Sequence, residues 1–305
     1  MVLLVGDSSF KLVGSDPHAL RNFRKSGFMD IFDAYMRLPS MKSLRDAEMV
    51  TIKSGDGILY LHQGEMVTVR YGTDSASTEP NGRIDPPLPR YVGTSEMTSC
   101  HAVFITSPAG YALGHLDGSE LLISKRVFRL QTLSSYLLND RIAPGSSDQL
   151  HVPVIRAVVF DTYGAALFPA SIQPEARGPL SVLRSSYVYS TSARSHMHNI
   201  LDPISHRLII RPFFIDEDTW ETLKRVEHYS REQLQSFSTT PKQETDHFYE
   251  MLKRTSLLLT TLKEEKIDLF AGGNLEFVFD AGAQQWCPAN PRAEEANRNP
   301  LTCFK

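Results

Sequence analysis

The sequence predicts an α+β fold in which a strand-rich region comes first and the longest helices follow it. The predicted elements run as strands, a helix, more strands and then helices, which differs from the regular strand–helix alternation of an α/β protein. No internal repeat is visible. With 305 residues, 41% of them hydrophobic, the chain is long enough for a full core. We therefore expect one domain over residues 1–305.

The strands are predicted from short apolar runs that alternate with polar residues or are bounded by turn signals. The chain begins with one such run, and residues 57–71 are interpreted as two strands around a Gln63-Gly64 turn. Residues 100–118 are interpreted as a hairpin with its turn at residues 107–110. Further strands are expected in a hairpin at residues 151–170, at residues 207–215, and at residues 267–273 and 275–286.

Helices are predicted where apolar residues recur at helical spacing after a capping residue. These segments are residues 15–36, 119–138, 217–237 and 244–264. Residues 72–90 are rich in Pro, Gly, Ser and Thr and are expected to form an exposed loop. The polar C-terminal segment, residues 289–305, is expected to be frayed.

Composition excludes two classes of protein. The net charge is −3, whereas a nucleic-acid-binding surface requires clustered Lys and Arg. No apolar run approaches the roughly 18 residues of a membrane helix. The first residues lack the basic region and long apolar stretch of a signal peptide. We therefore expect a cytosolic or nuclear protein that binds neither nucleic acid nor membranes. We also expect a monomer and no cofactor, although neither follows from composition.

The three cysteines are Cys100, Cys287 and Cys303. An odd, sparse count argues against a disulfide framework, and no Cys-x-x-Cys pair is present to form a thiolate zinc site. His196 and His198 alternate but have no third ligand nearby, so we interpret them as part of a solvated loop and expect no metal site. Cys100 is then either buried filler or a nucleophile, and the other two cysteines are taken as non-catalytic.

His115 is the candidate partner of Cys100. The two residues are 115 − 100 = 15 positions apart, on either side of the predicted turn. A hairpin with this turn places residue i opposite a residue near 216 − i, so position 100 falls opposite positions 115–116. Directly opposed residues have Cβ atoms roughly 4.5–5.5 Å apart. A thiolate–imidazolium contact, which activates a cysteine, is therefore within reach.

Neighbouring residues supply the other groups of a hydrolytic site. The hydroxyl of Thr94 is a candidate to orient the imidazole. The backbone amides of Ser99 and Cys100 are candidates for an oxyanion hole. A lone strand cysteine is commonly structural, so the spacing alone leaves both interpretations of Cys100 open.

Two motifs carry a family resemblance: GTSEMTSCHAVF at residues 93–104 and GHLDG at residues 114–118. They resemble the protein N-terminal asparagine amidohydrolase family, in which a Thr-Thr/Ser-Cys segment is followed one hairpin later by His-x-Asp. The likeness extends loosely over the C-terminal half, in RLIIRPFF, LQSFSTTPKQETDHFYEMLKRT and LFAGGNLEFVFDAGAQQW. The chain departs from the family pattern at residues 119–150, where it lacks the family's Gly-Gly strand.

The order of Thr94, Cys100 and His115 is also distantly similar to the triad of bacterial chemoreceptor glutamine deamidases and of cytotoxic necrotizing factor toxins. That similarity implies a β-sandwich-like mixed sheet core flanked by helices. It also implies roles: Cys100 as nucleophile, His115 as base and Thr94 as the orienting hydroxyl.

The resemblance implies a reaction in which the side-chain carboxamide of an N-terminal Asn is hydrolysed to Asp with release of ammonia. The partners are then proteins or peptides that begin with Asn and enter a degradation pathway after the reaction. Recognition of the free α-ammonium calls for a carboxylate, for which Asp117 and Glu96 are the candidates. Two alternatives stay open: deamidation of an internal Gln or Asn on a folded partner, and a non-catalytic, shortened relative that acts by interaction.

Overall fold

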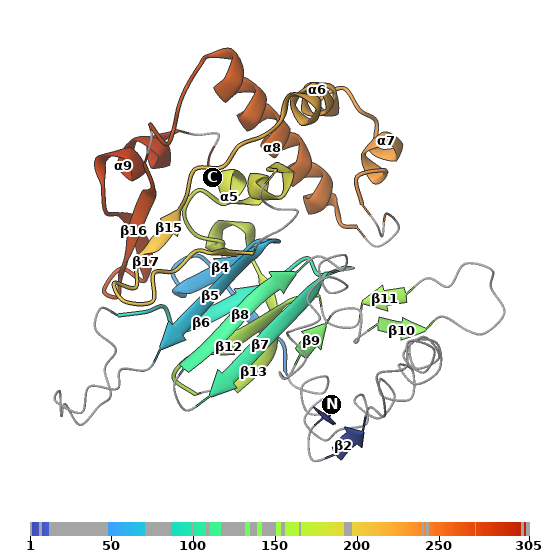
Figure 1. Ribbon diagram of the computed structural model, residues 1–305, viewed down its shortest axis with the longest axis vertical. Coiled ribbons are helices and arrows are strands. Elements are labelled where there is room, and N and C mark those ends of the chain that lie inside the picture. Colours follow the sequence, from blue (N-terminus) through green and yellow to red (C-terminus); the bar gives the residue numbers. More distant parts are fainter. Residues whose placement is uncertain are drawn as a thin grey trace.

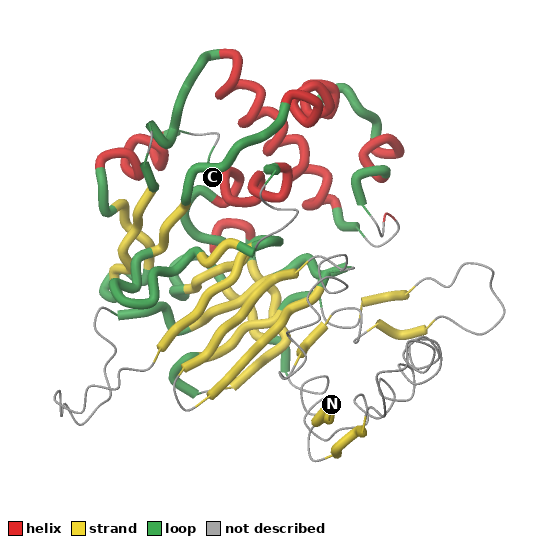
Figure 2. The backbone as a smooth tube through the Cα atoms, viewed as in Figure 1, coloured by secondary structure: helices red, strands yellow, loops and turns green. Residues whose placement is uncertain are grey.

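The computed structural model has a strand-rich lower part and a helical upper part (Figures 1 and 2). It describes residues 2–5, 8–11, 48–70, 87–98, 100–107, 110–116, 132–134, 139–141, 151–153, 156–164, 166–191, 197–238, 241, 244–271, 273–299 and 302. The predicted α+β class, with a sandwich-like mixed core flanked by helices, is confirmed.

Two five-stranded sheets form the sandwich. The first has the order β3 (Val50–Ile52), β13 (Ala166–Ile172), β12 (Val158–Asp161), β6 (Tyr91–Thr94) and β4 (Ile58–Leu61). The second has the order β14 (His198–Asn199), β5 (Glu65–Arg70), β8 (Gly110–Leu116), β7 (His101–Ser107) and β9 (Thr132–Ser134). Both sheets are mixed, because β4 with β6, β3 with β13 and β14 with β5 are parallel pairs.

The main core fills the space between these sheets. Phe160 of β12 packs against Phe104 of β7 and Tyr111 of β8, with ring centroids 4.5 Å and 5.0 Å apart. The chain passes from the first sheet to the second at the predicted Gln63-Gly64 turn, where Gly64 has a φ of 81°. Glycine adopts this left-handed conformation without the steric cost of a Cβ atom. The turn therefore brings the ends of β4 and β5 together at one end of the sandwich.

The helical layer lies above the ends of the sheets (Figure 1). It contains α5 (Ser181–Ser185), α6 (Glu217–Val226), α7 (Arg231–Gln235) and α8 (Asp246–Glu264), with 3₁₀ turns η2 (Pro174–Ala176) and η3 (Ser186–Tyr189) beside α5. Both α5 and α6 pack against α8. The predicted single helix over residues 217–237 is wrong, because Ser230 and Gln233 form a capping box that starts a separate helix at Arg231.

A third sheet joins β15 (Leu208–Ile210), β16 (Leu275–Asp280) and β17 (Gln285–Pro288) beside the helices. The predicted frayed tail is wrong over α9, Pro291–Arg298. Asn290 caps this helix by accepting from the Ala293 amide at 2.8 Å, and Pro291 occupies a first-turn position. Its Ala293 and Ala296 are fully buried, so packing on β16 holds the segment in place.

Two further predictions are wrong in part. A strand, β9, lies inside the segment predicted as a helix over residues 119–138, and it satisfies backbone groups of β7, to which it pairs. Residues 267–273 form no strand among those described. There Asp268 accepts from the amides of Phe270 and Ala271, which closes a turn instead.

The remaining small pairs are β1 (Val2–Val5) with β2 (Ser8–Lys11) and β10 (Asn139–Arg141) with β11 (His151–Pro153). The predicted helix at residues 15–36 lies outside the described residues, as does the predicted loop apart from residues 87–90, where Leu88 is buried. None of the helices in the described part of the chain has the length and apolar character needed to cross a bilayer.

Candidate functional site

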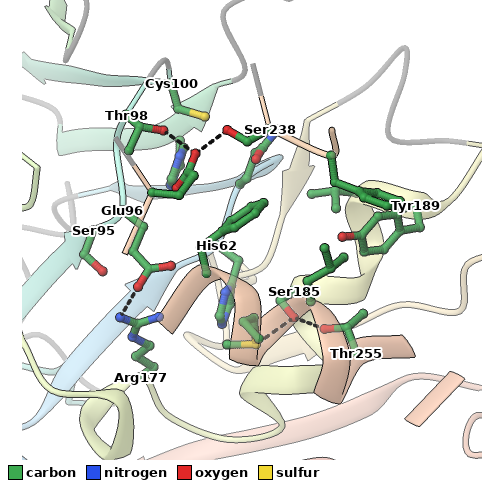
Figure 3. Close-up of a pocket in the computed structure, with 18 of the residues that line it drawn as sticks. His62, Ser95, Glu96, Thr98, Cys100, Arg177, Ser185, Tyr189, Ser238 and Thr255 are labelled. Carbon is green, nitrogen blue, oxygen red and sulfur yellow. Dashed lines mark hydrogen bonds and ion pairs between the residues drawn. The ribbon is translucent and has the colours of Figure 1, made fainter. Parts of the chain in front are cut away.

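A pocket of about 200 Å³ lies between the end of the sandwich and the helical layer (Figure 3). Its floor and one wall come from β4, the turn after β4, the segment after β6, and β8. The other wall comes from α5, η3, α8 and the segment that precedes α8. Cys100 and His115, the sequence's candidate pair, both line this pocket.

Thr94 and His115 connect the two sandwich sheets. Thr94 ends β6 of the first sheet, His115 lies near the end of β8 in the second, and both are buried. The Thr94 hydroxyl donates to the Leu61 carbonyl at 2.7 Å. The same oxygen lies 2.6 Å from Nδ1 of His115. A hydroxyl has one proton, so once that proton is directed to Leu61, Nδ1–H of His115 is the donor to Oγ1.

This proton count defines the tautomer of His115. In a neutral imidazole one ring nitrogen carries the proton and the other carries a lone pair. With the proton on Nδ1, the lone pair is on Nε2, the nitrogen that a general base uses. The predicted pairing of Thr94 with His115 is present as a contact, and its orienting role in catalysis stays a prediction.

Cys100 does not lie directly opposite His115. In the observed register His101 pairs with Leu116 and Ala102 pairs with His115. Residue i therefore lies opposite residue 217 − i, instead of the predicted 216 − i. The difference arises because the two-residue connection at 108–109 pairs Ser107 with Gly110. Cys100 lies two residues before Ala102, just before β7 begins at His101, and both Cys100 and His115 line the pocket.

The chain between β6 and β7 turns its polar side chains into the pocket. Ser95, Glu96, Thr98 and Cys100 all line it. Glu96 has a φ of 61°, a left-handed conformation that costs a non-glycine residue about 1–2 kcal/mol. Strain of this kind persists where surrounding contacts hold it, and it is concentrated at functional sites.

Arg177 is the contact that holds Glu96. Its side chain is 5% exposed, and Nη2 donates to Glu96 Oε1 at 2.8 Å. The guanidinium also lies over the ring of Tyr60, 5.1 Å from the centroid. Burial and the acidic neighbours act in opposite directions, and the pKa of Arg177 is raised overall because Tyr60 and Glu96 outweigh desolvation. Glu96, one of the two predicted amine-binding residues, is therefore paired with a buried cation.

His247, in the first turn of α8, completes this cluster. Its Nε2 lies 2.5 Å from Arg177 Nη1 and 3.2 Å from Glu96 Oε1. Arg177 has only donors to offer, so Nε2 of His247 accepts from Arg177 in the neutral ring. Burial, followed by the charge of Arg177, lowers the pKa of His247 despite Glu96, which favours the same neutral form.

Glu244 forms the second acidic group of the pocket, and the sequence analysis missed it. Thr98 Oγ1 donates to Glu244 Oε1 at 3.0 Å, and the Ser238 hydroxyl donates to the same oxygen at 2.5 Å. Figure 3 shows Thr98, Cys100 and Ser238 together at one end of the pocket. The only sequence signal was the hydroxyl-rich SFSTTP segment, which lies inside one of the C-terminal stretches that carry the family resemblance.

A buried ion pair joins two of the elements beside the pocket. Arg184 of α5 binds Glu65 of β5 through two hydrogen bonds of 2.9 Å and 2.6 Å. Glu65 also accepts from the backbone amide of His62 at 2.7 Å. Breaking such a buried pair by removing one partner costs about 3–5 kcal/mol. The pair thus fixes the turn that joins the two sheets to the helical layer.

Two predicted site residues, Ser99 and Asp117, lie outside the described residues. His198 of β14 packs its ring against Tyr187, 5.1 Å between centroids, whereas His196 is not described. Within the described ranges, no group of three or more His, Cys, Asp or Glu side chains is arranged to hold a metal ion.

The fold and the pocket together define an α+β sandwich in which a thiol and an imidazole line one pocket at the junction of two sheets, and a hydroxyl contacts the imidazole. The chain belongs to the protein N-terminal asparagine amidohydrolase family, whose model matches residues 120–286. It is similar to the human protein N-terminal asparagine amidohydrolase, with 29% identity over 147 residues. That alignment covers 47% of this chain and 43% of the human protein, so it spans less than half of the relative's length.

The family match covers one wall of the pocket. Arg177, Ser238 and Glu244 lie inside residues 120–286, as does all of α8. Thr94, Cys100 and His115 precede the matched region. The helical wall therefore lies inside the family match, and the thiol side of the site lies outside it.

Proposed function

We propose that this chain hydrolyses the side-chain carboxamide of an N-terminal asparagine, leaving aspartate and ammonia, with Cys100 as the nucleophile. The observation that carries the proposal is the Thr94–His115 contact of 2.6 Å in the wall of the pocket that Cys100 also lines. A nucleophile, a base and a group that orients the base are the three parts of such a site. Family membership supports the choice of reaction.

In the first half of the proposed reaction, the Cys100 sulfur attacks the carboxamide carbon, and His115 Nε2 takes the thiol proton. The tetrahedral intermediate carries an oxyanion, for which the backbone amides of Ser99 and Cys100 are the proposed donors. The C–N bond then breaks. The proton held by His115 goes to the leaving nitrogen, so ammonia departs and a thioester remains.

In the second half, His115 takes a proton from water, and the resulting hydroxide attacks the thioester carbon. The C–S bond breaks and returns its electron pair to sulfur, which takes back the proton from His115. The product is a free N-terminal aspartate. We propose that this new residue commits the product protein to degradation through its altered N-terminus.

Replacement of the proposed nucleophile gives the direct test. Cys100→Ala is expected to lower ammonia release from an Asn-initiated peptide by at least about 1,000-fold, because no other group then forms the thioester. Ammonia is measured with the purified full chain, alongside circular dichroism to follow the fold. Cys287→Ala is the matched control, since Cys287 is the other described free cysteine and does not line the pocket.

The same assay separates the alternatives. Gln-initiated and N-acetylated Asn peptides are expected to release little ammonia, whereas an internal deamidase accepts the acetylated peptide equally well. A non-catalytic relative releases none, and its Cys100 does not react selectively with a mild alkylating agent at neutral pH. Undiminished activity of Cys100→Ala contradicts the proposed mechanism.

A further inference from the structure

Two buried hydroxyl groups meet in the wall of the pocket. Tyr60 belongs to β4, Ser95 directly follows β6, and the phenol oxygen lies 2.8 Å from Ser95 Oγ. Both residues line the pocket, and they are only 2% and 6% exposed. Figure 3 shows Ser95 beside Glu96, on the opposite side of the pocket from Ser185. The hydroxyl pair is therefore shielded from bulk solvent and lies where the substrate of the proposed reaction binds.

The pair has one more proton than its own hydrogen bond uses. Each hydroxyl has one proton to donate and an oxygen that accepts, and a single hydrogen bond joins the two groups. Within the described part of the chain, this contact is the one hydrogen bond of either side chain. A buried donor without an acceptor costs about 1–3 kcal/mol. The second proton is therefore available to an acceptor on a molecule that enters the pocket.

Ser95 is the residue that has this second proton. A phenol is more acidic than an aliphatic hydroxyl and is the better donor, so Tyr60 donates to Ser95 Oγ. Burial raises the pKa of Tyr60, although the charge of Arg177 opposes the change, and the phenol keeps its proton at neutral pH. Hydrogen bonds that form a chain strengthen one another. Ser95 is thus made a better donor by the bond that it accepts.

An Asn-initiated chain offers two acceptors in its first residue. Its ammonium and its carboxamide nitrogen only donate, whereas the carboxamide oxygen and the first peptide oxygen accept. In the proposed reaction the backbone amides of Ser99 and Cys100 hold the carboxamide oxygen, so the first peptide oxygen needs a different donor. Four bonds separate this oxygen from the carboxamide carbon, a span of roughly 3–5 Å. Both groups therefore fit within one pocket of about 200 Å³.

We infer that Ser95 donates a hydrogen bond to the oxygen of the first peptide bond of the substrate, and that Tyr60 is the positioning residue that orients the Ser95 hydroxyl. This inference rests on the proposed function and adds to it a contact with the main chain of the substrate. The contact does not involve the side chain of the second residue, so every Asn-initiated chain is able to make it. It holds the first residue in place while Cys100 attacks the side chain.

Binding to a protein without the nucleophile tests this contact. The host is Cys100→Ala, and the probes are a short Asn-initiated peptide and the same peptide with sulfur in place of the first peptide oxygen. A thioamide sulfur accepts hydrogen bonds poorly, so the sulfur is expected to weaken binding to the host by roughly 3- to 10-fold, as for a lost neutral hydrogen bond. Adding Ser95→Ala is expected to reduce this sulfur penalty to less than about 2-fold, because the two changes remove the same contact.

The ratio of the two affinities is the readout, because a variant that merely loosens the pocket weakens both probes alike. Ser185→Ala is the matched control. Ser185 lines the same pocket, but its hydroxyl donates to the Val182 carbonyl at 2.8 Å, which uses its proton. This control is expected to keep the full sulfur penalty. Tyr60→Phe retains the Ser95 proton and is expected to keep a larger penalty than Ser95→Ala does.

The outcomes separate the inference from the proposed function. If the unmodified protein releases ammonia from Asn-initiated peptides and Ser95→Ala leaves the sulfur penalty unchanged, the inference is wrong and the function stands. If the penalty collapses in Ser95→Ala but the unmodified protein releases no ammonia, the function is wrong and the main-chain contact stands. A host without a penalty, or a penalty that Ser185→Ala or Tyr60→Phe removes as fully as Ser95→Ala, overturns the assignment to Ser95.

Discussion

At the scale of single residues, Thr94 contacts both the Leu61 carbonyl and the His115 imidazole. Its hydroxyl donates to Leu61 and accepts from Nδ1 of the imidazole, which leaves the Nε2 lone pair for proton transfer. Serine is able to reproduce both contacts, whereas valine has the same shape and reproduces neither. Such a pair of substitutions separates the hydroxyl from the packing of the side chain.

Thr94→Val is expected to lower kcat by roughly 10- to 100-fold and to destabilise the fold by about 1–3 kcal/mol, because two buried polar groups lose a partner. Thr94→Ser is expected to recover most of kcat. The measurements are steady-state ammonia release and urea unfolding. If serine and valine reduce kcat equally, the hydroxyl has no orienting role.

Some of these site residues are predicted from the sequence and others are not, and the difference has a physical cause. Thr94, Cys100 and His115 belong to one hairpin and the strand before it, so their proximity follows from local spacing. The contacts of Glu96 with Arg177 and of Thr98 with Glu244 join residues 81 and 146 positions apart. Spacing carries no information about such pairs, because they form only when the helical layer packs on the sandwich.

At the scale of elements, β6 is held closely against β12 at Gly93. A Cβ atom at this position would lie 2.6 Å from a Val159 methyl carbon and 2.7 Å from the Val158 carbonyl oxygen. The second contact is with backbone, which cannot move without disturbing the sheet. Gly93 therefore sets the spacing of the strand that ends in Thr94.

Gly93→Ala is expected to destabilise the protein by about 1–3 kcal/mol, the range for overpacking, and to lower activity by shifting Thr94. Gly164→Ala is the control, since a Cβ there meets only the Asp161 side chain at 3.6 Å, and a change within about 0.5 kcal/mol is expected. Urea unfolding of both variants provides the comparison. If Gly93→Ala and Gly164→Ala are equally stable, β12 has moved to accommodate the added methyl group at position 93.

Some elements predicted from local chemistry agree with the structure, others were missed although they carried local signals, and one was decided by packing alone. The β4–β5 and β7–β8 reversals follow from apolar runs on either side of a turn. The break between α6 and α7 and the helix α9 carried usable signals, a Ser-x-x-Gln capping box and an Asn-Pro start. The strand β9 had none, since only the edge of β7 selects an extended conformation there.

At the scale of the whole molecule, joining the sandwich to the helical layer buries His62. It follows β4, and its Nε2 lies 3.1 Å from the Ser181 hydroxyl of α5. Burial, and then the charges of Arg184 and Arg177, lower the pKa of His62 well below its ordinary 6.5. The folded protein therefore keeps this ring neutral at a pH where the unfolded chain binds a proton.

The sign of the pH effect follows from that difference. Below pH 6.5 the unfolded state takes up a proton that the native state does not, so the free energy of unfolding falls as the pH falls. A histidine whose pKa is lowered by folding changes the free energy of unfolding by up to about 1.4 kcal/mol per pH unit. This slope continues as the pH falls until the folded-state pKa is reached. Above pH 7.5 both states are neutral at His62, and its contribution to the slope disappears.

His62→Gln is expected to reduce the loss of stability between pH 7.5 and pH 5.5, whatever its effect at neutral pH, because glutamine does not titrate. His228→Gln is the control, as His228 is exposed at the end of α6. Urea unfolding at several pH values gives the slopes. If His62→Gln and His228→Gln have the same pH dependence as the unmodified protein, His62 is protonated equally in both states, and the junction between sandwich and helices does not exclude the proton.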